Sequence, residues 1–151
     1  MNRMRKVLIA DDEVKVGQLV KRLIQWDRLG LTCIGLVTDG QTAYEKILSE
    51  SPDIVITDIR MPVLTGLEMI QKASEQGVKC HFIVVSGYKY FDYAQKALKY
   101  GVEDYLLKPI DEDELNRQLQ KIVAEEEQRE DKQQQVDQIE KKLEDSKYLR
   151  H

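Results

Sequence analysis

The sequence predicts an α/β fold in which helices cover both faces of a parallel β-sheet. The chain has 151 residues, enough for one compact domain with an extension. Its 42% of hydrophobic residues can form a packed core. Short apolar clusters alternate five times with segments of helical periodicity, which is the pattern of parallel strands joined by helical crossovers.

The apolar clusters predict five short strands that should be largely buried. Four of them are rich in the β-branched residues that strands favour. In order along the chain, they span residues 6–10, 32–37, 54–57, 81–85 and 104–107.

The segments between these strands predict amphipathic helices, because their apolar residues gather on one helical face. The four apolar sets lie within residues 16–24, 43–48, 67–73 and 91–98.

A fifth helix has the clearest start. Asp111 can cap it, and Glu114 occupies the capping-box position three residues later. Its predicted apolar face consists of Leu115, Leu119 and Ile122.

The composition changes near Glu125, so we expect a domain at residues 1–124 and a charged helical segment at residues 125–151. The segment has no Gly or Pro and is built mostly of helix formers. A seven-residue apolar spacing that includes Val136 and Leu143 favours a coiled coil or signalling helix, although polar residues interrupt it. A solvated linker that is only partly helical is the alternative.

The charge pattern argues against direct binding to nucleic acid or membranes. The net charge is −4, without the overall basic bias of a DNA-binding domain. No segment approaches the roughly 20 apolar residues that span a bilayer, and the N-terminus turns acidic before a signal-peptide core can develop. We therefore expect a cytoplasmic protein. Cys33 and Cys80 do not have the spacing of a metal site, so we expect both to be buried and to pack as small hydrophobic residues.

Polar side chains follow four of the predicted strands. In open parallel sheets, ligands gather beyond the carboxyl ends of the strands, so these residues should converge on one rim. The set consists of Asp11, Asp12, Glu13, Asp58, Ser86 and Lys108.

Close carboxylates need a cation, because at 4 Å each pair repels by about 4 kcal/mol at an effective dielectric near 20. Carboxylate oxygens without His or Cys favour Mg²⁺ or the similar Mn²⁺. Lys108 adds a positive charge and Ser86 adds a hydroxyl, so the set suits phosphoryl transfer. Asp58 is then the candidate nucleophile.

Four motifs resemble the successive signatures of response-regulator receiver domains. They are LIADDE, IVITDIRMPVLTG, IVVSGY and DYLLKPI, which occur in the family's order over about residues 6–124. The resemblance implies a flavodoxin-like, doubly wound five-stranded sheet of order 2-1-3-4-5. It also implies phosphorylation by a sensor histidine kinase.

The resemblance assigns roles to the acidic residues. Asp58 falls on the phosphoacceptor, Asp12 on the carboxylate that binds Mg²⁺ directly, and Asp11 on the second acidic ligand. The backbone carbonyl of Arg60 would complete the metal ligands.

It also implies a switch. Ser86 and Lys108 match the residues that hold the phosphoryl group, and Tyr105 falls on the aromatic position that changes rotamer as Ser86 moves. An ordinary strand aromatic is the alternative for Tyr105. Pro109 matches a proline whose preceding peptide bond is typically cis.

Arg60 and Tyr88 lie two residues beyond Asp58 and Ser86. We expect both to flank the path of an attacking water and to set the lifetime of the phosphoryl group.

The segments WDRLGLTCIGLVTDG and SGYKYFDYAQKALKYGVEDYLLKPI resemble receivers of AraC-type, YesN-like transcriptional regulators. This chain carries no helix-turn-helix pattern, so we expect a fragment whose DNA-binding output domain is absent, or a stand-alone receiver. The face formed by residues 91–98, 104–107 and the fifth helix should be remodelled by phosphorylation. We expect homodimerisation through that face and the C-terminal helix.

Two rival functions are weaker. A phosphatase of the haloacid-dehalogenase kind needs a second Asp where Arg60 stands, and it needs room for a cap domain. A pseudo-receiver would act by protein interaction alone, but every acceptor-site group is present. We therefore expect no enzyme beyond assistance to its own phosphorylation and dephosphorylation.

Overall fold

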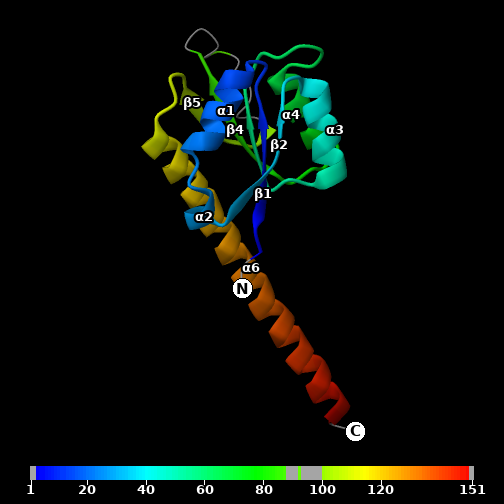
Figure 1. Cartoon of the computed structure of the whole chain (residues 1–151). Helices are drawn as coiled ribbons and strands as arrows, with labels where there is room; N and C mark the ends of the chain where they lie inside the picture. Colours follow the sequence, from blue (N-terminus) through cyan, green and yellow to red (C-terminus); the bar gives the residue numbers. More distant parts are fainter. Residues whose placement is uncertain (1–2, 88–91, 93–99, 150–151) are drawn as a thin grey trace. The chain divides into compact units, whose positions relative to one another are not determined.

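The computed structural model contains a five-stranded parallel sheet of order β2-β1-β3-β4-β5 (Figure 1). The structure describes residues 3–87, 92 and 100–149. Each strand lies within two residues of its predicted bounds, which confirms the predicted fold class. The strands are β1 (Arg5–Ala10), β2 (Leu31–Val37), β3 (Ile54–Thr57), β4 (His81–Ser86) and β5 (Val102–Leu107).

The three central strands are buried almost throughout, whereas the two edge strands are not. Leu36 in β2 is 40% exposed and Leu107 in β5 is 43% exposed. The expectation that all five strands are largely buried was therefore wrong for the edges. An edge strand has a neighbour on one side only, so part of its surface stays in contact with water.

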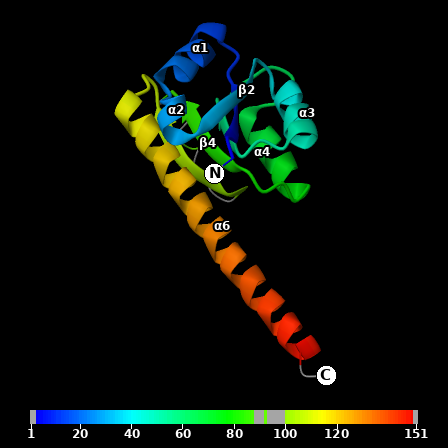
Figure 2. The ribbon, with the colours of Figure 1, turned by 60° about the horizontal axis from the view of Figure 1, so that its bottom comes forward.

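Helices α3 and α4 lie together on one side of the sheet and α1 lies on the other (Figures 1 and 2). Side chains alternate between the two faces of a strand. Val55 and Val84 therefore join the core cluster on the α3 and α4 side. The described helices are α1 (Val14–Leu23), α2 (Trp26–Leu29), α3 (Gly40–Glu50), α4 (Gly66–Glu75) and α6 (Glu112–Leu149).

The helix pattern was matched with two differences. The four-residue helix α2 was not predicted, and it ends at Gly30, which adopts the left-handed conformation with φ of 67°. Leu19 and Leu48 belong to the predicted apolar faces but are 39% and 48% exposed. The apolar stripe of each helix is wider than the part of the helix that packs against the rest of the domain. The predicted helical pattern at residues 91–98 lies outside the described residues.

The start of α6 is capped by Asp111, whose carboxylate accepts a hydrogen bond from the N–H of Glu114. Asn116, 3% exposed, then ties the first turns of α6 to the end of α1. Its amide donates to the carbonyl of Leu23 and accepts from the N–H of Gln25, each at 2.9 Å.

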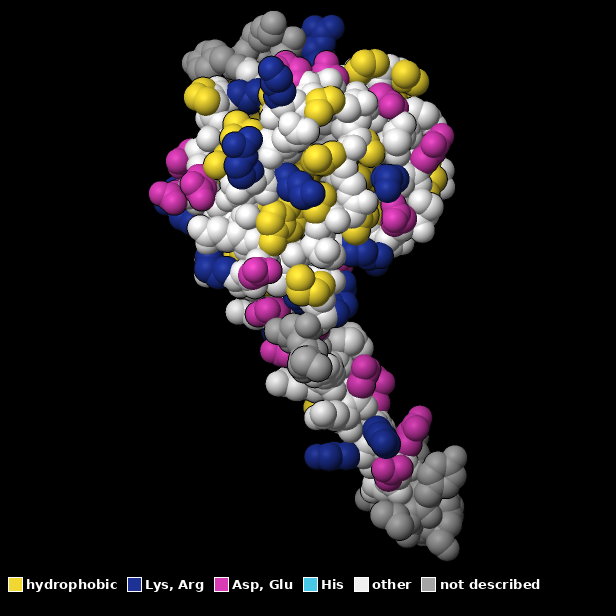
Figure 3. Space-filling view, in the orientation of Figure 1, with side chains coloured by type: hydrophobic (Ala, Val, Ile, Leu, Met, Phe, Trp, Pro, Cys, Tyr) yellow, Lys and Arg dark blue, Asp and Glu magenta, His cyan; other side chains and the backbone are white. Residues whose placement is uncertain are grey.

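The chain divides into two compact units, residues 1–118 and 119–151. In the second unit, α6 continues as an uninterrupted helix to Leu149, and residues 131–146 are exposed. Glu126 is 6% exposed and pairs with Arg129 at 2.8 Å. No helix in the described ranges is long and apolar enough to cross a membrane. On the face shown in Figure 3, basic side chains are interspersed with acidic and hydrophobic ones.

Candidate functional site

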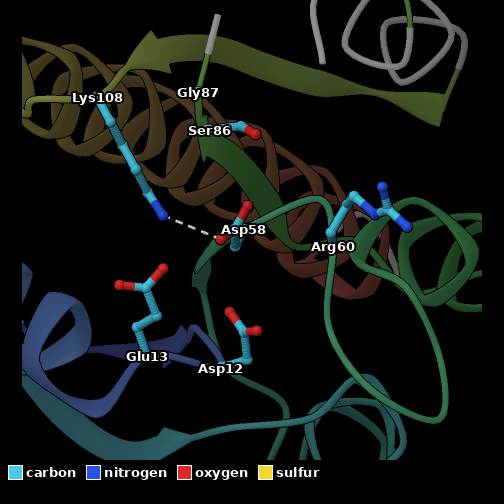
Figure 4. Close-up of a pocket in the computed structure, with 7 residues that line it drawn as sticks. All are labelled: Asp12, Glu13, Asp58, Arg60, Ser86, Gly87 and Lys108. Carbon is cyan, nitrogen blue, oxygen red and sulfur yellow. Dashed lines mark hydrogen bonds and ion pairs between the residues drawn. The ribbon is translucent and has the colours of Figure 1, made fainter. Parts of the chain in front are cut away.

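The carboxyl ends of β1, β3, β4 and β5 meet around a cavity of about 250 Å³ (Figure 4). Five of the six strand-end residues in the predicted set line it directly. The sixth, Asp11, contacts the same lysine that reaches into the cavity. The lining residues are Asp12, Glu13, Asp58, Arg60, Ser86, Gly87 and Lys108.

Asp58 follows β3 and is only 7% exposed. Its backbone N–H donates to the carbonyl of Ala10 in the neighbouring strand at 2.9 Å. Its Oδ1 accepts a hydrogen bond from the N–H of Ile59 at 2.7 Å, and its Oδ2 contacts Nζ of Lys108 at 3.0 Å. The two carboxylate oxygens therefore have different partners, and the side chain is held in one orientation.

Two glycines let the loop after Asp58 pack closely. A Cβ atom at Gly66 would lie 1.9 Å from the carbonyl oxygen of Asp58. A Cβ atom at Gly40 would lie 1.8 Å from the carbonyl oxygen of Leu64. Thr65 and Glu68 then form a capping box that starts α4. The loop is thus fixed at both ends, and it fixes the backbone of Asp58.

Asp11 and Asp12 follow β1 and bring two more carboxylates to Asp58. Single carboxylate oxygens of the three residues lie within 4.8 Å of one another. Asp11 is 5% exposed, whereas Asp12 is exposed. Burial raises the pKa of Asp11, the backbone N–H of Glu13 lowers it, and the charge of Asp58 raises it further. The net pKa lies above the usual value despite the nearby Lys108.

This donor set fits a hard divalent cation. Three carboxylates offer one oxygen each, and at 4.8 Å each pair repels by about 3.5 kcal/mol at an effective dielectric near 20. Such a cluster matches the oxygen ligands that Mg²⁺ takes in phosphoryl-transfer sites. Arg60 lines the same cavity, and Figure 4 shows its guanidinium directed away from Asp58.

Lys108 follows β5, where its backbone N–H donates to the carbonyl of Ser86 at 3.0 Å. Its Nζ lies between two carboxylates, 3.0 Å from Asp58 and 3.2 Å from Asp11. Burial disfavours the charged ammonium group, but the hydrogen bond and ion pair with Asp58, together with Asp11, outweigh burial and raise the pKa of Lys108. The peptide bond between Lys108 and Pro109 is cis.

Ser86 and Tyr105 lie on neighbouring strands at the same edge of the cavity. Ser86 is fully buried, and its Oγ forms no hydrogen bond of good geometry among the described residues. It still lies near the Tyr105 hydroxyl: burial raises the pKa of Tyr105, and the Ser86 hydroxyl partly offsets that rise. The hydroxyl of Tyr105 donates to the carbonyl of Gly87 at 3.0 Å. A buried hydroxyl without a partner is unfavourable, so the Ser86 Oγ is available for a ligand oxygen. Tyr88 lies outside the described residues.

Two residues that shape this site, Gly66 and Thr57, lie outside the set predicted from the sequence, and Glu13 was in that set without a role of its own. Glu13 points into the cavity in Figure 4, and Gly66 permits the close approach of the loop. Thr57 is 1% exposed, and its hydroxyl donates to the carbonyl of Asp58 at 2.9 Å. A hydroxyl at the end of the otherwise aliphatic strand IVIT was the available signal for Thr57.

Comparisons with known proteins show the family of this chain. Residues 7–120 match the family model of the response regulator receiver domain. Over 122 residues, the chain is 46% identical to the uncharacterized transcriptional regulatory protein YesN of Bacillus subtilis, covering 81% of this chain and 33% of that protein. It is 35% identical over 120 residues to the transcriptional regulatory protein HptR of Staphylococcus aureus, covering 80% of this chain and 47% of that protein.

The fold is also similar to solved structures. The REC domain of AraT, a response regulator from Geobacillus stearothermophilus, superposes with a TM-score of 0.80 at 36% identity, covering 84% of this chain and 98% of that one. A two-component transcriptional regulator AraC from Clostridium phytofermentans gives a TM-score of 0.72 at 30% identity, covering 80% of this chain and 93% of that one. The chain spans between a third and a half of the length of these curated relatives.

Proposed function

This chain belongs to the response regulator receiver domain family, and from that premise we propose that it is a phosphorylation switch whose acceptor is Asp58. Receiver domains of two-component systems interact with histidine kinases, which supply the phosphoryl group. The observation that carries the proposal is the placement of the Asp58 carboxylate, 3.0 Å from Lys108 and within 4.8 Å of two further carboxylates.

Asp11, Asp12 and Asp58, together with the backbone carbonyl of Arg60, would hold the cation. Bound Mg²⁺ or Mn²⁺ would neutralise charge on the acceptor and on the incoming phosphoryl oxygens. The raised pKa of Asp11 supports this assignment, because burial and, to a smaller extent, the charge of Asp58 disfavour its ionised form, and a bound cation would offset both effects.

In the transfer step, a carboxylate oxygen of Asp58 forms a bond to the phosphorus atom of a phosphohistidine. The bond between phosphorus and the imidazole nitrogen breaks, and its electron pair stays on the nitrogen. Lys108 and Ser86 provide an ammonium group and a hydroxyl for the phosphoryl oxygens. The buried Oγ of Ser86, which forms no hydrogen bond of good geometry among the described residues, supports its part in this step.

The switch would follow from the Ser86 hydroxyl moving to the phosphoryl group. That movement makes room for Tyr105, whose bond to the carbonyl of Gly87 would break. The change would remodel β5, the start of α6 and the segment at residues 91–98, of which the last lies outside the described residues. Arg60, and Tyr88 beyond Ser86, would control access of water to the phosphoryl group.

The output of the switch is proposed from the relatives. Their names place similar receivers in transcriptional regulators, and this chain spans only part of their length. We infer that phosphorylation controls an AraC-type DNA-binding domain outside these residues. Homodimerisation would proceed through the β5 and α6 face and through residues 125–151, which would act as a linker or signalling helix.

Labelling tests the acceptor. The protein is incubated with Mg²⁺ and a small phosphodonor, and the modified residue is found by mass spectrometry after borohydride trapping of the aspartyl phosphate. We expect D58N to abolish labelling and D137N, on the exposed part of α6, to leave it unchanged. Labelling of D58N at the parent rate would refute the assignment. Beryllofluoride, a mimic of the phosphoryl group, tests the pseudo-receiver alternative, because a pseudo-receiver would show no Mg²⁺-dependent response to it.

A further inference from the structure

Thr57 stands out in β3 because it places a hydroxyl in a buried aliphatic strand. The strand reads IVIT, all four residues are buried, and Thr57 is 1% exposed. Val has nearly the same shape and would fill the position without a polar atom. A buried hydroxyl is tolerated where it forms a hydrogen bond, and the Oγ1 of Thr57 donates to the carbonyl oxygen of Asp58 at 2.9 Å.

The carbonyl oxygen of Asp58 is confined from two directions. The Thr57 hydroxyl donates a hydrogen bond to it, and the backbone of Gly66 packs closely against it. A Cβ atom at Gly66 would approach this oxygen to 1.9 Å. Gly66 itself donates its N–H to the carbonyl of Ile59 at 2.6 Å, so the next peptide unit along the loop is held by a hydrogen bond as well.

Confinement of this carbonyl also orients the acceptor side chain. The peptide unit between Asp58 and Ile59 is planar, so the direction of the Asp58 carbonyl fixes the direction of the Ile59 N–H. That N–H donates to Oδ1 of Asp58 at 2.7 Å. The other oxygen, Oδ2, is then turned toward Nζ of Lys108 at 3.0 Å.

We propose that Thr57 is a positioning residue for the phosphoacceptor: its hydroxyl fixes the Asp58–Ile59 peptide, and this peptide fixes the Asp58 carboxylate. The inference rests on the proposed function of Asp58. Thr57 does not line the cavity, so it would act only through the backbone of its neighbour. The alternative is a hydroxyl that only satisfies its own hydrogen bond.

Two matched pairs of variants separate the hydroxyl from the methyl group. Thr57 and T57V differ by the hydroxyl with the branched shape kept, and T57S and T57A differ by the hydroxyl with the methyl group absent. A hydrogen bond of ordinary net strength corresponds to about a five- to tenfold change in rate. We therefore expect phosphorylation by a small phosphodonor with Mg²⁺ to slow about five- to tenfold in T57V and by the same factor between T57S and T57A.

Two further measurements distinguish positioning from general packing. The maximal labelling rate should fall in T57V while the phosphodonor concentration at half-maximal rate stays constant. The amide proton of Ile59, bonded to a carboxylate at 2.7 Å, should resonate downfield in the parent and T57S and move upfield in T57V. Urea denaturation should show that T57V stays fully folded under the labelling conditions, although the change leaves the buried carbonyl of Asp58 without its donor and so lowers stability.

The outcomes are distinguishable. Failure of the parent itself to label at Asp58 would remove the proposed function and this inference together. Labelling of the parent with an equal rate in T57V would overturn the inference alone. Equal slowing in T57S and T57A would assign the effect to the methyl group, which also overturns it.

Discussion

Removal of the Lys108 charge should make the stability of this protein depend on a divalent cation. The variant K108M keeps the length and apolar character of the side chain and deletes the ammonium group. Each contact of Nζ, at 3.0 Å to Asp58 and 3.2 Å to Asp11, corresponds to about 5 kcal/mol of Coulomb attraction at an effective dielectric near 20. The three carboxylates repel by about 3.5 kcal/mol per pair at 4.8 Å.

The attraction by Lys108 and the repulsion among the three carboxylates therefore nearly cancel in the parent, whereas only the repulsion remains in K108M. Removal of the ammonium group also removes the free-energy cost of desolvating it, and water screens its ion pairs because the Lys108 side chain is 24% exposed. The net loss of stability is therefore smaller than the gross Coulomb attraction. We expect K108M to lose about 2–3 kcal/mol of unfolding free energy without divalent ions. Saturating Mg²⁺ should reduce this difference to below about 1 kcal/mol. Removal of the neighbouring positive charge strengthens Mg²⁺ binding, so the ion adds more stability to K108M than to the parent.

Urea denaturation in EDTA and in Mg²⁺ measures both differences, with K141M on the exposed part of α6 as the control. The pKa of Lys108 is raised above 10.5, so its contribution is fully present below pH 10.5 and is lost only as pH rises through the folded value. Equal stability of K108M and the parent in EDTA would refute the electrostatic reasoning. A difference that Mg²⁺ leaves unchanged would refute the cation site.

Three further substitutions test the surroundings of the site. Burial is the largest cause of the raised pKa of Asp11, so the ionised Asp11 carboxylate destabilises the folded state increasingly as pH rises above 3.8. D11N should therefore be more stable than the parent at pH 7 in EDTA, and its thermal unfolding should be insensitive to Mg²⁺. A D11N variant that is less stable than the parent would contradict this reasoning. Val63 has φ of 69° and is 82% exposed, so V63G should gain about 0.5–1 kcal/mol in urea denaturation; V63A, which keeps a Cβ atom, is the control. G66A should lose about 3 kcal/mol and slow labelling, because its Cβ would lie 1.9 Å from the Asp58 carbonyl oxygen. G17A in α1 is the control, since a Cβ there would make an ordinary contact with the Leu36 side chain at 3.7 Å.

Periodicity and strand-end chemistry predicted most of the fold and the composition of the site. The central strands β1, β3 and β4 were visible because continuous β-branched runs have few other uses in a short segment. The short helix α2 was not visible, because four residues are too few for a helical period. Partial exposure of Leu36 and Leu107 was also missed, because the apolar pattern of a strand does not show how much of its surface an edge position leaves uncovered.

The sequence by itself determined which chemical groups are available: carboxylates after β1 and β3, a hydroxyl after β4 and a lysine after β5. Only the tertiary structure decided how those groups are paired. Lys108 bridges Asp11 and Asp58, and Thr57 acts on the Asp58 backbone, through contacts between atoms a few ångströms apart. Residues 50 positions apart along the chain meet in that way only once the sheet has assembled, so no local pattern can specify their distances.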